Sequence, residues 1–316
     1  MRNLIFIIGV CFVYASCEQK AAYPQVVHPK DNASNAYKVA LGKKLFFDTR
    51  LSKDNTISCA TCHQPNKAFS DNLPVSFGVE GKMVHRNVPS IINAAYLTRV
   101  MFDGELKTLE LQTIVPLQEP TEMDMDLKVL MKRLKAIPEY QKLSKLAFGH
   151  SFDAWTLTRS LACYVRSLVS WKSRFDDYYF RHKNTLSKDE LAGYKLFSEK
   201  LYCAKCHVPP HFTSFETASN GLGDMNDGGR YEITGDSSDF GKFKIPSLKN
   251  IAITFPYMHN GSMKSLDDVI DYYEKGGNHG PNQSIIIQKF SLSKQEKAQL
   301  KAFFFSLTDM SLNTKN

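Results

Sequence analysis

Cys59-Ala60-Thr61-Cys62-His63 and Cys203-Ala204-Lys205-Cys206-His207 are two copies of one pattern, in which two cysteines stand two residues apart and a histidine follows. This pattern is the attachment sequence of a c-type haem. The thiols bond to the porphyrin edge, and the histidine becomes a ligand of the iron. A zinc half-site does not need that histidine, and a thioredoxin-like redox pair does not need a second copy. The sequence therefore predicts two c-type haems, held by Cys59, Cys62 and His63 and by Cys203, Cys206 and His207.

A second shared pattern precedes each haem motif. Residues 42–46 and 193–197 both read Gly-x-Lys-Leu-Phe, each at the end of a helical pattern and just before a turn. We interpret the repeat as an internal duplication of a cytochrome c unit. The expected fold is mainly α, with two cytochrome c-like domains over residues 30–184 and 185–310, each carrying one haem.

Helix starts are marked by two capping boxes, Ser187 with Glu190 and Ser293 with Glu296. The second opens a predicted C-terminal helix over residues 298–307, and further helices are predicted over 127–134 and 155–171. Residues 220–241 are rich in Gly, Asp and Asn and predict a long loop. Strands are expected only as short ribbons.

Composition narrows the class of protein. The chain has 316 residues, 43% of them hydrophobic, which favours two globular domains. The net charge of +8 is spread along the chain rather than gathered in one basic arm. This argues against nucleic acid as a partner and suits an acidic redox protein or an anionic membrane surface. Cys163 lies within a helical apolar pattern and is expected to be a small core residue.

The N-terminus predicts export. Arg2 precedes an apolar run over residues 4–14, which has the length of a signal peptide rather than a membrane span. Residues 14–17 are similar to a bacterial lipoprotein cleavage box, so residues 1–16 are expected to be a lipoprotein-type signal peptide and Cys17 a lipid anchor. The alternative is ordinary cleavage that leaves Cys17 free. Either route places the mature protein in the periplasm.

Further stretches match a known family in the expected order. They are residues 42–48, 58–63, 69–71, 86–94, 102–104, 122–123, 243–250, 256–261 and 266–277, together with Gln112. On these stretches, which run over nearly all of the mature chain, the sequence resembles the bacterial diheme cytochrome c peroxidase family, which includes the MauG-type enzymes.

The resemblance implies two helical cytochrome c domains that face each other. The N-terminal haem, ligated by His63, would react with hydrogen peroxide, and the C-terminal haem, ligated by His207, would store and relay an electron. Gln112 and Glu122 fall at the family's distal catalytic positions, where a carboxylate can shuttle a proton and an amide can orient peroxide. Taken alone, Glu122 would be a helix-start charge and Gln112 a polar surface residue.

The resemblance also implies a calcium ion between the haems. Its ligands would be Asn87 and the main-chain carbonyls of Thr254 and Pro256, and oxygen ligands of this kind suit calcium. Without the family, Asn87 would be interpreted as a turn residue.

Three positions depart from the peroxidases. Val79 stands where peroxidases that need reductive activation carry a histidine ligand, which predicts an open peroxidatic haem; nearby His85 is expected to be an exposed loop residue. Tyr273 stands where the peroxidases have the methionine ligand of the second haem, and MauG-type enzymes have a tyrosine there too. Met258 and Met263 are alternative ligands. Phe102 replaces a tryptophan often found between the haems.

The resemblance thus implies a periplasmic cytochrome c peroxidase that takes electrons from a small reduced cytochrome c or copper protein. The alternative is a MauG-like oxidase, which uses peroxide to oxidise a protein or other large substrate. A third hypothesis is a non-enzymatic electron carrier with both irons fully ligated by the protein. The family resemblance also suggests a homodimer.

Overall fold

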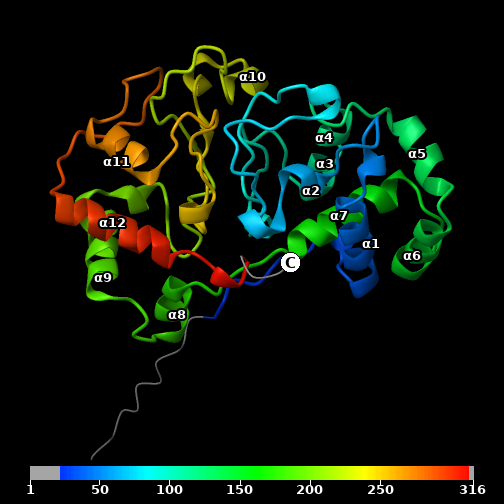
Figure 1. Cartoon of the computed structure of the whole chain (residues 1–316), viewed down its shortest axis with the longest axis horizontal. Coiled ribbons are helices and arrows are strands. Elements are labelled where there is room, and N and C mark those ends of the chain that lie inside the picture. Colours follow the sequence, from blue (N-terminus) through cyan, green and yellow to red (C-terminus); the bar gives the residue numbers. More distant parts are fainter. Residues whose placement is uncertain (1–21, 313–316) are drawn as a thin grey trace, which may run out of the picture.

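The computed structural model describes residues 22–312, which fold into two helical lobes that lie side by side (Figure 1). The predicted signal peptide, residues 1–16, and Cys17 lie outside the described residues. The first lobe contains α1 (Ala36–Phe46), α2 (Cys59–Cys62), α3 (Leu109–Gln112), α4 (Val115–Gln118), α5 (Leu127–Lys135), α6 (Pro138–Phe148) and α7 (Ala154–Ser167). The second contains α8 (Arg174–Arg181), α9 (Lys188–Lys195), α10 (Tyr231–Thr234), α11 (Leu266–Glu274) and α12 (Lys294–Ser306).

The strands of the described residues form one short ribbon in the second lobe. There β1 (Thr217–Ala218) pairs antiparallel with β2 (Phe243–Lys244). The prediction of a mainly α fold is therefore confirmed. No helix within residues 22–312 is long and apolar enough to cross a membrane.

Each lobe has its own hydrophobic core. The buried side chains of the first core lie between residues 41 and 165 and include Leu41, Leu45 and Leu161. Those of the second lie between residues 175 and 307 and centre on aromatic rings, among them Phe197 and Phe303. A haem motif adjoins each core, because Cys59 packs against the first and Cys203 against the second.

The glycine of the repeated Gly-x-Lys-Leu-Phe pattern lies at a close helix crossing in both lobes. A Cβ atom on Gly42 of α1 would lie 1.9 Å from the main-chain oxygen of Ser160 in α7. A Cβ atom on Gly193 of α9 would lie 2.0 Å from the main-chain oxygen of Gln299 in α12. Only glycine permits both approaches, which supports the interpretation of an internal duplication.

The predicted helix starts are confirmed. Ser187 and Ser293 cap α9 and α12, and each exchanges hydrogen bonds with the glutamate three residues later. The C-terminal helix begins earlier than predicted, at Lys294, because the capping box itself supplies its first turn. The helix predicted over 127–134 is α5, which Asp126 caps.

The prediction of a helix over 155–171 is wrong at its end, because α7 stops at Ser167. Asn93 causes this ending. Its amide donates to the main-chain oxygen of Ser170 at 3.0 Å, and its side-chain oxygen accepts from the Ser170 N–H at 2.8 Å. Its own N–H donates to the oxygen of Leu168 at 2.8 Å. These bonds use backbone groups that a longer helix would need.

The predicted loop over 220–241 holds two short helical turns, α10 and a 3-10 turn at Ser237–Asp239. An ion pair ties this loop to the first lobe, because the Arg86 guanidinium binds Asp227 at 2.6 and 2.8 Å and Asp103 at 2.6 Å. Cys163 is buried in α7, as predicted for a core residue. His85 is exposed, also as predicted.

Candidate haem sites

The first haem motif forms the short helix α2 and the turn after it. The Nδ1 atom of His63 lies 3.0 Å from the main-chain oxygen of Phe69. Burial lowers the pKa of His63, which keeps the imidazole neutral. A neutral ring that donates through Nδ1 leaves the lone pair of Nε2 for a metal. The local fold therefore prepares His63 as a haem ligand.

The second motif repeats this arrangement. The Nδ1 atom of His207 lies 3.0 Å from the main-chain oxygen of Pro246 and 3.2 Å from that of Phe212. Burial lowers the pKa of His207 as well. Both histidines thus have a main-chain carbonyl partner that orients the ring, as is usual for histidines that bind metals.

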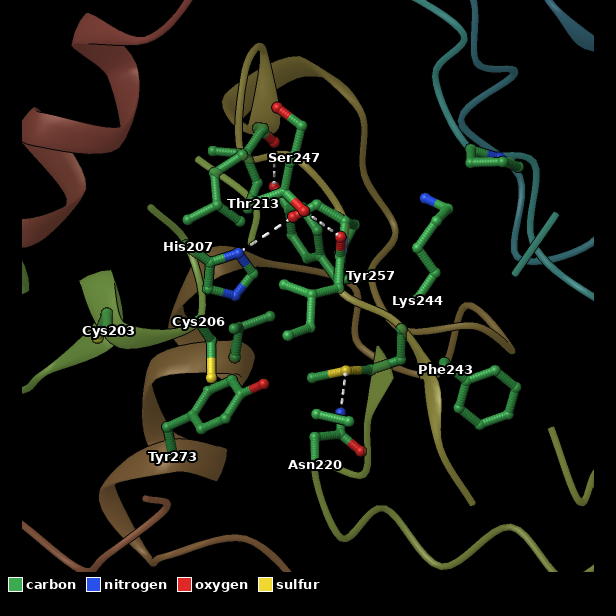
Figure 2. Close-up of a pocket in the computed structure, with 18 of the residues that line it drawn as sticks. Cys203, Cys206, His207, Thr213, Asn220, Phe243, Lys244, Ser247, Tyr257 and Tyr273 are labelled. Atoms are coloured by element: carbon green, nitrogen blue, oxygen red, sulfur yellow. Dashed lines mark hydrogen bonds between the residues drawn. The ribbon is translucent and has the colours of Figure 1, made fainter. Parts of the chain in front are cut away.

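A cavity of about 350 Å³ opens beside the second motif, and Figure 2 shows part of its lining. Cys203, Cys206 and His207 line it from the motif side. Tyr273 enters from α11 with its hydroxyl directed toward the cavity. Met258 also lines the cavity, whereas Met263 is not among the lining residues. The structure therefore brings both Tyr273 and Met258 to the second motif.

Asn220 lies next to both of these side chains. Its amide nitrogen donates a hydrogen bond to the sulfur of Met258 at 3.2 Å (Figure 2). Burial raises the pKa of the Tyr273 hydroxyl, and the neighbouring Asn220 side chain opposes this rise. The sequence analysis did not single out Asn220, which is the first residue of the predicted loop over 220–241.

Lys244 provides a test of whether the cavity suits a haem. Its side chain points into the cavity and makes no hydrogen bond or ion pair with any other residue between 22 and 312. Burial lowers the pKa of this lysine to about 8. A cation without a partner is costly in such a place, and the propionate groups of a haem are carboxylates that would pair with it. With apolar walls from Leu201, Ile270 and Phe304, the cavity fits the group.

Glu122 lies at the first motif. Its main-chain oxygen accepts a hydrogen bond of 2.8 Å from Val79, and a Cβ atom on Gly78 would lie 2.4 Å from the same oxygen. Burial, together with a smaller contribution from the charge of Glu122, raises the pKa values of the Cys59 and Cys62 thiols, so the carboxyl group lies near the motif.

The pKa of the Glu122 carboxyl group is also shifted. Burial raises its pKa to about 7, and the nearby charge of Glu119 adds to the rise. A carboxyl group of this kind exchanges protons near neutral pH, which an ordinary surface glutamate does not do. Shifted pKa values of this kind are typical of catalytic acids and bases.

The other predicted residues of the first site are less closely tied to it. Gln112 ends α3 and is partly buried, and its side chain makes no hydrogen bond within residues 22–312. Its catalytic role stays a prediction. Val79 is fully buried, so an apolar side chain occupies the position where some family members place a histidine ligand.

The predicted calcium ligands lie between the lobes. Asn87, Thr254 and Pro256 all line the cavity of the second motif, as does Phe102. The amide of Asn87 donates to the main-chain oxygens of Leu73 and Pro74, which leaves its own side-chain oxygen available. No group of three or more His, Cys, Asp or Glu side chains in the described part of the chain is arranged to hold a metal ion. Calcium here would rely on neutral oxygens and stays a prediction.

Comparisons with known proteins agree with this arrangement. Residues 36–185 match the family model of the di-haem cytochrome c peroxidases. The chain is 38% identical to the methylamine utilization protein MauG of Methylorubrum extorquens, over 89% of this chain and 81% of that protein. It is 33% identical to cytochrome c551 peroxidase of Nitrosomonas europaea, over 75% and 72% of the two chains.

Solved structures show the same relationship. A MauG-like protein associated with microbial copper homeostasis superposes with a TM-score of 0.87 and 33% sequence identity, covering 92% of this chain and 95% of that one. The diheme peroxidase BthA of Burkholderia thailandensis shares the fold, with a TM-score of 0.79 over 89% of this chain and 88% of its own. With both haem motifs in place, the chain belongs to the di-haem cytochrome c peroxidase family.

Proposed function

We propose that the protein reduces hydrogen peroxide to water at the first haem motif, with electrons from a small reduced cytochrome c or copper protein. The observation that carries this proposal is Glu122, a partly buried carboxyl group with a pKa of about 7 near Cys59 and Cys62. A haem bound there by His63 would supply the iron that binds peroxide and accepts the electrons.

Glu122 would move the proton that the reaction requires. As a carboxylate it would accept a proton from one oxygen of the peroxide. It would then return that proton to the other oxygen, which leaves as water. The overall reaction consumes one peroxide, two electrons and two protons and yields two waters. A pKa near neutrality suits both directions of transfer. Gln112 would orient the peroxide through its amide.

The buried Val79 supports an open peroxidatic haem. Since valine cannot ligate iron, the protein would react with peroxide as isolated, in its fully oxidised state. Electrons would enter singly through the second haem, held by Cys203, Cys206 and His207. Because Phe102 is harder to oxidise than tryptophan, transfer between the haems would proceed by direct tunnelling.

A second candidate is a MauG-like oxidase, and Tyr273 favours it. Tyrosine ligation lowers the potential of a haem relative to methionine ligation and so stabilises oxidised states. Tyr273 faces the cavity of the second motif. Similarity to MauG and to a MauG-like protein points the same way. In this reaction the electrons would come from a protein or other large substrate.

One experiment separates the two candidates. The as-isolated, fully oxidised holoprotein is mixed with peroxide and a reduced small cytochrome c. Rapid oxidation of the cytochrome indicates the peroxidase. Absence of turnover, with a long-lived oxidised form of the protein, indicates the MauG-like reaction. No spectral response to peroxide at all contradicts both and leaves an electron carrier.

We also propose the setting of this chemistry. The domains would span residues 30–184 and 185–310, in a periplasmic protein whose signal peptide is residues 1–16. Cys17 would carry a lipid anchor. Calcium would bind Asn87 and the carbonyls of Thr254 and Pro256, and the protein would form a homodimer, as the family resemblance suggests.

A further inference from the structure

Two side chains that can ligate iron line the same cavity as His207. Tyr273 offers a phenol from α11, and Met258 offers a thioether from the loop before that helix. The choice has consequences, because methionine raises the potential of a haem and tyrosine lowers it. The residue that contacts both is Asn220.

Asn220 is held in place by its own surroundings. Its side-chain oxygen accepts a hydrogen bond of 3.1 Å from the N–H of Leu222. Its main-chain oxygen accepts one of 3.0 Å from the hydroxyl of Tyr272, which is buried next to Tyr273. These two bonds fix the direction of the amide group, so its nitrogen is left to donate toward the cavity.

That nitrogen donates to the sulfur of Met258 at 3.2 Å (Figure 2). A thioether sulfur is a weak acceptor with two lone pairs. The hydrogen bond from Asn220 holds this sulfur at the wall of the cavity. Asn220 also lies next to the Tyr273 hydroxyl, which is directed into the cavity.

We propose that Asn220 is a positioning residue that selects the axial ligand of the second haem, by binding the sulfur of Met258 and leaving the position to Tyr273. This deepens the MauG-like candidate, since it rests on Tyr273 as the ligand. It assigns the choice of ligand to a residue that does not itself touch the iron, in keeping with the general role of outer partners in tuning metal sites.

The test compares three holoproteins, the wild type, Tyr273→Phe and the double variant Asn220→Leu/Tyr273→Phe. The readouts are the long-wavelength charge-transfer band that a thioether gives a ferric haem, and the midpoint potential of the second haem. We expect no such band in the wild type or in Tyr273→Phe. The double variant should gain the band, and its potential should rise above that of Tyr273→Phe.

Three results would overturn the proposal. They are a thioether band in the wild type, a band in Tyr273→Phe alone, or no band in a double variant that retains both covalent haems. An unchanged ferric spectrum of the second haem in Tyr273→Phe also overturns the proposal, because Tyr273 is then not the ligand. Peroxide turnover with reduced cytochrome c tests the proposed function separately.

Two further variants control for indirect effects of the substitutions on the haem spectrum. Adding Met258→Leu to the double variant should abolish the new band, because the sulfur is then absent. Asn278→Leu in the Tyr273→Phe background is the control for loss of an asparagine. Asn278 is exposed, and its amide also contacts Leu222, at 3.4 Å from the main-chain oxygen. A band in this control would contradict the specific role of Asn220.

Discussion

Gly42 of α1 lies so close to Ser160 of α7 that a Cβ atom would stand 1.9 Å from the Ser160 carbonyl oxygen. Gly193 and Gln299 repeat this relationship in the second lobe, at 2.0 Å. The glycine precedes the first cysteine of the haem motif by 17 residues in the first lobe and by 10 in the second. The same close crossing of two helices is therefore present in each haem-bearing lobe.

Alanine at either glycine should destabilise its own lobe. The added methyl group would meet rigid backbone, so we expect a loss of about 1–3 kcal/mol in the free energy of unfolding for Gly42→Ala or Gly193→Ala. Urea denaturation of the holoprotein measures this loss. Lys43→Ala is the control, since Lys43 is the exposed neighbour of Gly42. Equal stability of Gly42→Ala and Lys43→Ala would contradict the close crossing.

Glu122 should govern the pH dependence of peroxide consumption. Its pKa of about 7 means that the carboxylate, the form that accepts a proton, becomes populated as the pH rises through neutrality. We therefore expect kcat/KM for peroxide to increase with pH over this range. Glu122→Gln should lower kcat/KM by roughly 10²- to 10⁴-fold and remove the pH dependence.

Glu119→Gln is the matched control for that measurement. Because the charge of Glu119 helps to raise the pKa of Glu122, its removal should move the rise in kcat/KM to lower pH and leave the maximal rate unchanged. A profile that is identical in the wild type and in Glu122→Gln would show that another group moves the proton.

Lys244 should tune the second haem. Its cation points into the cavity without a partner among the described residues, and a positive charge there favours the reduced haem. We expect Lys244→Met to lower the midpoint potential of that haem, and Lys244→Arg to keep it near the wild-type value. Spectroelectrochemical titration measures both. A Met variant with an unchanged potential would place Lys244 too far from the haem to matter.

Lys249 and Asp176 form a buried ion pair. Replacing one partner should destabilise the protein far more than replacing both. The ammonium lies 2.6 Å from a carboxylate oxygen, and the two side chains are 2% and 0% exposed. Lys249→Met leaves the Asp176 charge buried alone, so we expect a loss of about 3–5 kcal/mol.

The double variant Lys249→Met/Asp176→Leu should recover most of that stability, because neither charge remains. Chemical denaturation of the two variants and the wild type completes the comparison. If the double variant is no more stable than Lys249→Met, the loss does not come from an unpaired buried charge. The attraction between Lys249 and Asp176 would then itself stabilise the fold.

Some of this protein could be predicted from its sequence, because the governing interactions are local. The haem motifs place two thiols and an imidazole within five residues, and the capping boxes of α9 and α12 join residues three apart. The repeated glycine pattern indicated the duplication. The end of α7 was predicted wrongly, since Asn93, more than seventy residues away in the chain, binds the backbone of Ser170.

Only the tertiary structure decided the environment of each reactive group. The pKa of Glu122 depends on its partial burial and on Glu119, and Lys244 lines a cavity in which no residue between 22 and 312 pairs with its side chain. Asn220, Met258 and Tyr273 come from three separate segments that meet at one wall. Residue types and short spacings are properties of the sequence, whereas desolvation and contact between distant segments exist only once the chain has folded.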